Sequence, residues 1–361
     1  MATLRTKIRS SILALTVLGV CAGCSTLTPC PVGTVGSAPP AEKASVLFLI
    51  GDAGEPGEGG EPVLEALTRA ASEAARLHGA ENVAIAFLGD MIYPNGLPTP
   101  GEAKRAEMER KLDAQIEVAA KSGVRTYFVP GNHDWWGNKD AGLKRILTLE
   151  DYLREDNAGL TELAPSGGCP GPTVIDVGEK IQLVAIDTHW WLRKGEKGKH
   201  CTVSTEAAFD QALHDALTEA GGRKSVIAAH HPLISGGPHG GTTLFLRAWG
   251  VYPQDIPHKR YQALKNRLEA VFADAPTAIF AAGHEHSLQL HRGPTYTHLV
   301  AGGGNVRVLT SVGAVDETVT CEAGTGFARY TVGEDGDAHL SLYSVGPDGM
   351  AREIFAGPPP V

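Results

Sequence analysis

Four consecutive residues, Gly131-Asn132-His133-Asp134, follow an apolar run and bring three kinds of polar side chain together. They offer an amide oxygen, an imidazole and a carboxylate in succession. Strand packing requires none of these groups, but a reaction centre uses all three, as a neutral oxygen ligand, a proton donor and an acid that orients the donor. A polar turn is the competing interpretation, because Gly and Asn commonly end strands.

Four other apolar runs end in the same way, which favours the chemical interpretation. Continuous apolar runs are typical of strands that are buried on both faces. Each of these runs is followed within a few residues by side chains that bind metals. They are Asp52 after Val46–Ile50, Asp90 and Tyr93 after Val83–Leu88, His230 after Ser225–Ala229, and His284 and His286 after Ala278–Ala282.

Helical patterns separate these runs, and strands that alternate with helices predict crossover units and a largely parallel sheet. The expected helices are Val63–Leu77, Glu102–Lys121, Lys139–Glu155, Thr205–Glu219 and Arg260–Ala273. Three further strands, expected to be antiparallel, are Tyr296–Val300, Phe327–Val332 and His339–Tyr343. No linker interrupts the series, so one catalytic domain is expected over 45–350, followed by a C-terminal tail over 351–361.

In an open α/β sheet, functional residues gather outside the carboxyl ends of the strands. The five runs would therefore bring carboxylates, a phenol, an amide oxygen and several imidazoles to one edge. Mixed oxygen and nitrogen ligands of this kind suit two borderline or hard metal ions that share a carboxylate. The glycine-rich stretch Gly51–Gly60 lacks the Lys-Ser/Thr ending of a phosphate loop and the glycine spacing of a dinucleotide site, so we predict no nucleotide site there.

The ordered blocks GDAG, GDMIY, GNHD, the His after VIAA, and GHEH resemble those of the calcineurin-like metallophosphoesterases. Tyr93, three residues after Asp90, narrows the resemblance to the purple acid phosphatases, particularly the small tartrate-resistant type. The resemblance covers about residues 45–305. It implies a four-layer α/β/β/α sandwich of two mixed sheets flanked by helices, and an acid phosphatase that hydrolyses phosphate monoesters through in-line attack of a metal-bound hydroxide.

The resemblance also implies the roles of the site residues. Fe(III) would be bound by Asp52, Asp90, Tyr93 and His286. A divalent ion (Fe, Zn or Mn) would be bound by Asp90, Asn132, His230 and His284. His133, oriented by Asp134, would protonate the leaving group or hold the phosphate. His239 would be a second histidine that contacts the substrate.

Several of these residues have a structural alternative. Asp52 and Asp90 are also common types of helix N-cap, and Tyr93 has an apolar body that often only packs. His231 and His230 are adjacent and interchangeable on the sequence alone. His239 lies in a Gly-rich loop of a kind that is often merely exposed. We expect Asp187, Trp190 and Trp191 to anchor a loop. Trp135 and Trp136 are candidates for a pocket wall, with plain burial as the alternative that is more common for aromatic residues.

Two other functions fit the same blocks. One is a metallophosphodiesterase or nucleotide hydrolase on the same fold, with Mn or Zn in both metal sites. The other is a surface lipoprotein that keeps the fold only as a binding scaffold. The intact set of ligands argues against the scaffold, because a scaffold does not need Asn132 and His133 together.

The N-terminus is predicted to be an export signal. Met1–Ser10 is basic, and the apolar run Ser11–Val20 is too short to cross a bilayer. Ala22-Gly23-Cys24 then resembles a bacterial lipoprotein cleavage site, with Cys24 as the lipid-anchored first residue of a cell-envelope protein. Plain secretion with cleavage nearby is the alternative. The prediction is therefore a signal peptide over 1–23 and a flexible tether, rich in Pro, Gly, Ser and Thr, over 24–44.

Charge and cysteine content limit the partners and the compartment. Residues 1–23 contain three bases and no acids, so 29 bases face 41 acids in the remainder, a net charge of −12. This balance argues against a nucleic-acid partner, which requires clustered positive charge. The expected substrate, a small phosphate ester, is what the family resemblance implies. After export, Cys30, Cys169, Cys201 and Cys321 would lie in an oxidising compartment, where they allow three pairings. We prefer Cys169–Cys201, since both lie in one segment between blocks.

Overall fold

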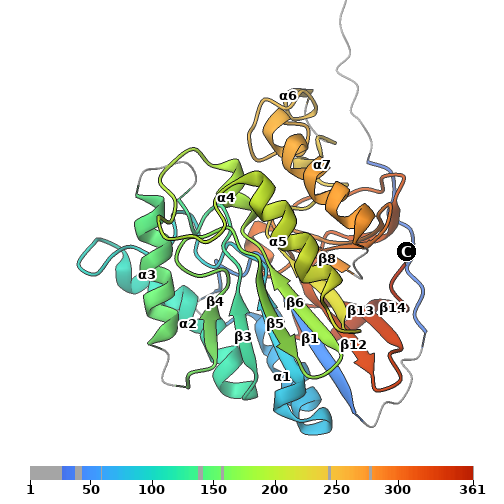
Figure 1. Ribbon diagram of the computed structural model, residues 1–361. Coiled ribbons are helices and arrows are strands. Elements are labelled where there is room, and N and C mark those ends of the chain that lie inside the picture. Colours follow the sequence, from blue (N-terminus) through green and yellow to red (C-terminus); the bar gives the residue numbers. More distant parts are fainter. Residues whose placement is uncertain are drawn as a thin grey trace, which may run out of the picture.

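Two mixed β-sheets of seven strands each form the centre of the protein in the computed structural model (Figure 1). The structure describes residues 27–36, 43–57, 59–136, 141–155, 158–242, 245–275 and 279–360. The predicted signal peptide over 1–23 and the predicted lipid-anchored residue Cys24 lie outside these residues. Among the helices of the described chain, none is both long and apolar enough to cross a membrane.

The first sheet has the strand order β14-β13-β12-β1-β2-β3-β4. Strands β1 to β4 run parallel to one another, and the three C-terminal strands add an antiparallel half. Its strands are β1 Ala44–Ile50, β2 Val83–Phe87, β3 Arg125–Phe128, β4 Thr161–Leu163, β12 Gly326–Gly333, β13 Ala338–Val345 and β14 Ala351–Gly357.

The second sheet has the strand order β11-β9-β10-β8-β7-β6-β5. Strands β6, β7, β8 and β10 run parallel, with antiparallel strands at both sides. Its strands are β5 Thr173–Val177, β6 Ile181–Ala185, β7 Lys224–Ala228, β8 Ile279–Ala282, β9 Leu288–Arg292, β10 Thr297–Ala301 and β11 Thr318–Glu322.

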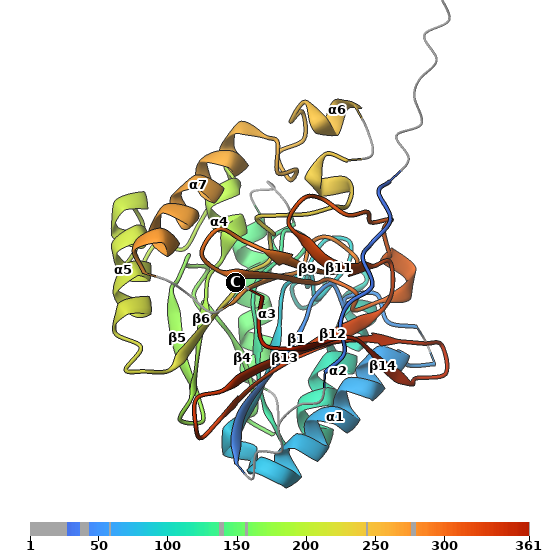
Figure 2. The ribbon, with the colours of Figure 1, turned by 90° about the vertical axis from the view of Figure 1, so that its right-hand side faces the viewer.

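Helices cover the outer faces of both sheets, so the protein has four layers in the order α/β/β/α, as expected (Figures 1 and 2). Helices α1 to α3 pack on the first sheet, and α5 and α7 pack on the second. The helices are α1 Pro62–His78, α2 Arg105–Ser122, α3 Gly142–Arg154, α4 Thr188–Leu192, α5 Glu206–Thr218, α6 Phe245–Ala248 and α7 Lys259–Asp274, with 3-10 turns at Ala80–Asn82, Pro238–Gly240 and Val306–Val308.

Strand β1 shows why the apolar runs form this arrangement. Side chains alternate between the two faces of a strand, and all seven residues of β1 are buried. Val46, Phe48 and Ile50 contact the layer that contains α1 to α3, whereas Leu47 and Leu49 join the core between the two sheets. A strand between two apolar layers needs an apolar residue at every position, and this requirement produces the continuous run in the sequence.

The structure contains two disulfide bonds, Cys169–Cys201 and Cys30–Cys321. The first is the pairing preferred from the sequence. The second joins residues 27–36, within the predicted flexible tether, to β11. The same segment forms a parallel bridge between Val35 and Ala356 in β14. Residues 27–36 therefore lie against the domain, a contact that the polar composition of the segment does not predict.

The C-terminal stretch differs from the expected tail. Residues Ala351–Gly357 form β14, which pairs antiparallel with β13 at the edge of the first sheet. The sequence ARE at its start is exposed and only Ile354, Phe355 and Ala356 are buried, so the apolar signal is three residues long. Short edge strands of this kind give a weak pattern, and the domain extends further toward the C-terminus than we predicted.

Candidate metal and active site

Five strand ends deliver the site residues to one edge of the two sheets. Asp52 follows β1 and Asp90 follows β2, Asn132 and His133 follow β3, and His230 and His284 follow β7 and β8. Asp52, Asp90 and His284 have backbone φ angles of 60°, 56° and 67°. Non-glycine residues in this left-handed region cost about 1–2 kcal/mol each, and such strain concentrates at functional sites.

Glycines of the sequence blocks leave room for these side chains. A Cβ atom on Gly131 would lie 2.2 Å from Oδ1 of Asp90, and one on Gly89 would lie 2.4 Å from Nδ1 of His230. Only a residue without a side chain allows the backbone to approach a ligand group this closely. The glycines directly before Asp90 and Asn132 are therefore part of the geometry of the site.

The first group of side chains consists of Asp52, Tyr93 and His286. The phenol Oη of Tyr93 donates a hydrogen bond to Oδ1 of Asp52 at 2.9 Å and lies 3.1 Å from Nε2 of His286. Nε2 of His286 is also 3.4 Å from Oδ1 of Asp52. Neighbouring ligands of an octahedral ion with bonds of about 2.1 Å lie about 3 Å apart, so this spacing fits one metal ion.

The second group consists of Asn132, His230 and His284, beside Asp90. Nε2 of His230 lies 3.0 Å from Oδ1 of Asn132 and 3.4 Å from Oδ2 of Asp90. The His230 and His284 rings are 5.0 Å apart. Asp90 lies between the two groups, since ligand atoms of Asp52, Asp90 and His286 also lie within 4.8 Å of one another. The structure thus brings all seven predicted metal ligands together at this edge.

Backbone carbonyl groups fix the orientation of the three predicted histidine ligands. Nδ1 of His230 donates to the carbonyl of Leu88, Nδ1 of His286 to that of Val308, and Nε2 of His284 to that of Gln254. Each ring therefore keeps one nitrogen lone pair that a metal can use. A second-shell hydrogen bond of this kind is usual for histidine ligands.

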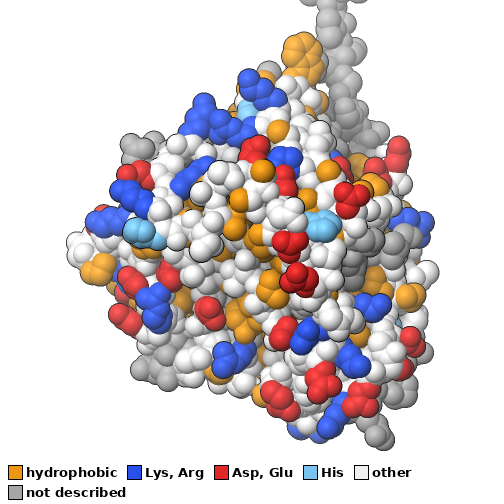
Figure 3. All heavy atoms as spheres, viewed as in Figure 1, with side chains coloured by type: hydrophobic (Ala, Val, Ile, Leu, Met, Phe, Trp, Pro, Cys, Tyr) orange, Lys and Arg blue, Asp and Glu red, His pale blue; other side chains and the backbone are white. Residues whose placement is uncertain are grey.

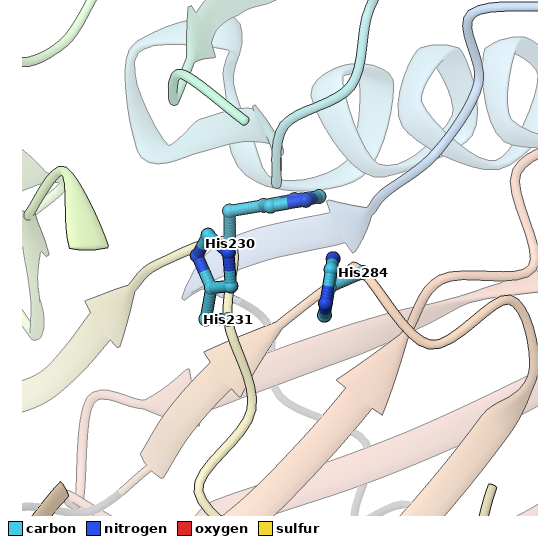
Figure 4. A group of neighbouring side chains, drawn as sticks. All are labelled: His230, His231 and His284. Carbon is cyan, nitrogen blue, oxygen red and sulfur yellow. The ribbon is translucent and has the colours of Figure 1, made fainter. Parts of the chain in front are cut away.

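His231 differs from these histidines, although it lies next to His230 and His284 (Figure 4). Its Nδ1 accepts a hydrogen bond from Oγ1 of Thr188 at 2.9 Å, and its Nε2 donates to Oε1 of Gln254 at 2.7 Å. Both nitrogens are occupied by protein groups. The hydrogen bonds therefore favour His230 over His231 as the ligand, a choice that the adjacent positions in the sequence left open.

The charge of the site fits bound cations. Asp52, Asp90 and Asp134 are fully or almost fully buried. Among the ion pairs of the described residues, none joins Lys or Arg to these three carboxylates. Buried carboxylates are costly unless a positive charge lies nearby, and metal ions supply that charge.

The pKa values reflect these surroundings when no ion is bound. Burial lowers the pKa of His230, but the negative charge of Asp90 outweighs burial and raises it to about 9. His286 follows the same pattern beside Asp52, with a pKa of about 9. Burial, followed by the charges of Asp52 and Asp90, holds the pKa of Tyr93 well above its usual value. A metal ion that binds here would displace protons from these groups.

His133 points its ring toward the open side of the site, and 36% of its side chain is exposed. Its Nδ1 donates to the carbonyl of Pro94 at 2.7 Å, and its ring lies 4.6 Å from that of Tyr93. The carboxylate of Asp134, which we expected to orient His133, accepts backbone N–H bonds instead from Asp90, Gly131 and Ile92. Asp134 therefore holds the loops that carry the ligands, and the Pro94 carbonyl orients His133.

An acid–histidine pair of the type expected at His133 occurs at His239. Nδ1 of His239 donates to Oδ1 of the buried Asp255 at 2.8 Å, and Arg247 donates to the same oxygen at 2.8 Å. The His239 and His284 rings are 4.0 Å apart, so His239 borders the site. The sequence analysis missed both residues. Arg247 lies in the four-residue helix α6 and Asp255 in the loop that follows it, and neither segment has a recognisable pattern.

Glu285, within the GHEH block, also has a role that we did not predict. Its buried carboxylate accepts hydrogen bonds from the backbone N–H of His239, Oγ of Ser235 and Oγ1 of Thr310. It therefore fixes the loop that carries His239. Asp187 is the N-cap of α4 and accepts a hydrogen bond from Nε1 of the buried Trp135, as expected for a residue that anchors a loop.

The α/β/β/α sandwich with candidate metal-binding groups at its strand ends is the arrangement of a metal-dependent enzyme class, which the family comparison identifies. The family model of the calcineurin-like phosphoesterases matches residues 46–288. The chain therefore belongs to the calcineurin-like phosphoesterase family, whose members act on phosphate esters, with two candidate metal-binding groups. No curated protein sequence matches it.

Three solved structures share the fold. GAP50, the anchor in the inner membrane complex of Plasmodium, has 16% sequence identity and a TM-score of 0.58, with 88% of this chain and 89% of that chain covered. Purple acid phosphatase PPD1 from yellow lupin (Lupinus luteus) seeds has 15% identity and a TM-score of 0.57, with 87% and 54% covered. PhoD has 12% identity and a TM-score of 0.55, with 89% and 70% covered. This chain thus spans about half the length of the lupin phosphatase.

Proposed function

We propose that the protein is an exported phosphatase that hydrolyses phosphate monoesters with two metal ions. One observation carries this proposal, namely the position of Asp90 between two groups of ligands that differ in charge. The phenol and carboxylate of Tyr93 and Asp52 suit a hard trivalent ion such as Fe(III). The amide and imidazoles of Asn132, His230 and His284 suit a divalent Fe, Zn or Mn ion.

When bound, the two ions would supply positive charge for the phosphate oxygens and lower the pKa of the water that attacks phosphorus. His133 can then act on the leaving group, because its Nδ1–H is fixed by the Pro94 carbonyl and its Nε2 faces Asp90 at 3.9 Å. His239 can contact a phosphate oxygen, because the Asp255 carboxylate holds its Nδ1 at 2.8 Å and fixes the ring at the border of the site. Asp134 positions the backbone of Asp90.

We also propose export to the cell envelope with a lipid anchor on Cys24; secretion without an anchor is the alternative. The two disulfide bonds support export, because disulfides persist in oxidising compartments.

A scaffold without catalysis is the alternative from another class. It is favoured by the likeness in fold to GAP50, which is described as an anchor in the inner membrane complex of Plasmodium. The orientation of each candidate histidine ligand by its own carbonyl argues for the enzyme, because a scaffold has no need for a free nitrogen lone pair at His230, His284 and His286.

The test is to measure the metal content and the turnover of p-nitrophenyl phosphate and its bis ester on the same preparation. The proposal expects two ions per chain and faster cleavage of the monoester. Faster cleavage of the diester by a protein with two Mn or Zn ions would favour the phosphodiesterase instead. Bound metal without turnover of either ester would favour the scaffold.

His133→Ala provides a second test of the mechanism. Loss of a general acid lowers turnover about 10²–10⁴-fold. The metal content should not change, because the hydrogen bond from His133 to Asp90 comes from the backbone N–H, which alanine keeps. The exposed His200 offers a matched control, and His200→Ala should leave turnover unchanged. Unchanged turnover in His133→Ala with both metals bound would exclude the proposed role of His133.

A further inference from the structure

Three large apolar side chains project from one loop beside the site. Trp249, Val251 and Tyr252 follow α6 and are 72%, 54% and 45% exposed. The loop is held at its base, where Arg247 pairs with Asp255 and contacts the Tyr252 ring. Apart from Val32 and Val35 in the N-terminal segment, the other large exposed apolar residues of the described chain are scattered over separate elements. Directly after α6, three such residues occur within four positions. We call residues 249–252 the apolar tip.

Basic side chains lie beside the apolar tip, although the protein is acidic overall. Lys194 and Lys259 are exposed and lie near His258. The backbone of His258 is next to Gly250 of the tip. Burial, followed by the charges of Arg260, Lys259 and Lys194, lowers the pKa of His258, so these cations lie close together. Figure 3 shows Lys and Arg side chains gathered over the end of the molecule where α6 lies.

The N-terminal segment of the described chain begins at the same end. Figures 1 and 2 both place its start at the end of the molecule that carries α6. A short series of contacts connects the two. The carbonyl of Thr28 accepts a hydrogen bond from the backbone N–H of Ala314, the N–H of Gly313 donates to the carbonyl of Gly236, and Gly241 lies against Ala248 in α6.

The distance to the predicted lipid anchor is short. Leu27 is three residues after Cys24, and three extended residues span at most about 11 Å. Residues 27–36 cannot lengthen this connection, because the Cys30–Cys321 disulfide and the Val35–Ala356 bridge hold them on the domain. A lipid on Cys24 would therefore bring this end of the domain to the membrane surface.

We propose that the apolar tip and the neighbouring lysines dock on an anionic lipid bilayer, which places the active site beside the membrane. Trp and Tyr favour the interface between lipid and water, and lysines there are attracted to anionic head groups. The inference rests on the lipid anchor proposed above. It does not depend on which phosphate ester the enzyme cleaves.

The test measures the contact of Trp249 with lipid. The full chain is expressed in cells, purified with its metals and reconstituted into vesicles of phosphatidylcholine and phosphatidylglycerol with brominated acyl chains. Brominated lipids quench nearby tryptophans, so we expect quenching in the wild type and its loss in Trp249→Phe. Leu77→Ser is the matched control, because Leu77 is 51% exposed in the last turn of α1, at the opposite end of the molecule. This variant should be quenched like the wild type.

Equal quenching of the wild type and Trp249→Phe would overturn the proposal, as would no quenching of either protein. Replacement of phosphatidylglycerol by phosphatidylcholine should weaken the quenching, and no change would exclude a role for the lysines. A further outcome is shielding of Trp249 in the absence of lipid together with a doubled sedimentation mass. This result would show that a second copy of the chain covers the apolar tip, and it would also overturn the docking proposal.

The mass of the N-terminal peptide from the same preparation tests the anchor separately. A peptide without lipid on Cys24 contradicts the anchor and leaves the phosphatase assignment untouched. The unanchored protein is then mixed with the same vesicles. If this unanchored protein also shows no quenching that depends on Trp249, the docking surface is overturned together with the anchor.

Discussion

Two pairs of buried histidines, only a few strands apart, behave in opposite ways. His230 and His286, which we call the site histidines, lie beside Asp90 and Asp52 and have pKa values of about 9 without a metal. His291 and His298, the rear histidines, are paired across β9 and β10 and are fully buried. Burial lowers the pKa of His291 to about 3 and holds that of His298 well below its usual value.

The neighbours decide this difference, since burial alone would keep all four rings neutral. A carboxylate beside an imidazole favours a positive charge, and the same place can hold a metal ion. The rear histidines have a structural role. Nε2 of His298 accepts hydrogen bonds from the backbone N–H groups of Leu233 and Ile234, at the start of the loop that leads to His239. For these four rings, a neighbouring carboxylate distinguishes the pair at the candidate metal site from the rear pair.

Removal of the shared carboxylate should have the largest effect on the site histidines. We expect Asp90→Asn to lose metal from both groups and to lower turnover about a thousandfold, or about 4 kcal/mol, because a metal site supplies several kcal/mol of charge stabilisation. Metal analysis and p-nitrophenyl phosphate turnover measure this. Asp187→Asn is the control, since Asp187 is equally buried but caps α4. Full metal content in Asp90→Asn would exclude a bridging role.

The phenol beside His286 should determine which metal binds there. If Tyr93 binds Fe(III), the protein absorbs visible light, and Tyr93→Phe should abolish the band and lower turnover about tenfold to a hundredfold. Tyr330→Phe is the control, because Tyr330 is buried and its hydroxyl has no hydrogen-bond partner among the described residues. A colourless wild type with two Mn or Zn ions would assign Tyr93 to the pocket wall.

A smaller effect on kcat/KM is expected at His239. In the described chain, it is the one histidine at the site whose carboxylate partner, Asp255, does not belong to either metal group. Asp255→Asn keeps the shape but removes the carboxylate that accepts hydrogen bonds from His239 and Arg247 and fixes the His239 ring. We expect KM to rise about tenfold at neutral pH with little change in kcat and none in metal content, because His239 would bind phosphate less well. If kcat fell with KM unchanged, Asp255 would act on the chemical step instead.

Much of the fold could be predicted from the sequence because its signals are local. The central parallel strands are buried on both faces and appear as apolar runs. A glycine stands directly before Asp52, Asp90, Asn132 and His284 and marks the turn that follows the strand. The edge strands β4, β5, β11 and β14 are short or half-exposed, so their patterns are weak. In the antiparallel half of the first sheet, the sequence predicted β12 and β13 but not β14.

The candidate ligands could be named from the sequence because they lie within a few residues of a strand end. Their partners could not, because they come from distant loops. Asp255 pairs with His239 across sixteen residues, and the carbonyl of Gln254 holds His284 across thirty. Asp134 was assigned to His133 because the two are adjacent in sequence. After a strand end, however, neighbouring side chains point in different directions, and Asp134 turns toward the backbone of Asp90.

The rear histidines should affect stability at acidic pH and leave catalysis unchanged. The pKa of His291 is lowered from 6.5 in the unfolded chain to about 3 in the folded protein. Between these values the unfolded state binds a proton that the folded state does not. The contribution of His291 to the free energy of unfolding is therefore fully present above pH 6.5 and is lost as the pH is lowered toward 3. At pH 4.5, the free energy of unfolding is lower by about 2–3 kcal/mol than above pH 6.5, as a result of this one group.

Glutamine cannot take up this proton, and it can still reach Gln289 and Thr318, the hydrogen-bond partners of His291. We therefore expect the free energy of unfolding of His291→Gln to depend less steeply on pH between 6.5 and 4.5 than that of the wild type. Some slope should persist, because the pKa of His298 is lowered as well. Urea unfolding of metal-free protein measures both slopes, with the exposed His200→Gln as control. An equal loss of stability at both pH values would mean that packing, and not protonation, sets the role of His291. The contrast between the site histidines and the rear histidines would then no longer rest on charge.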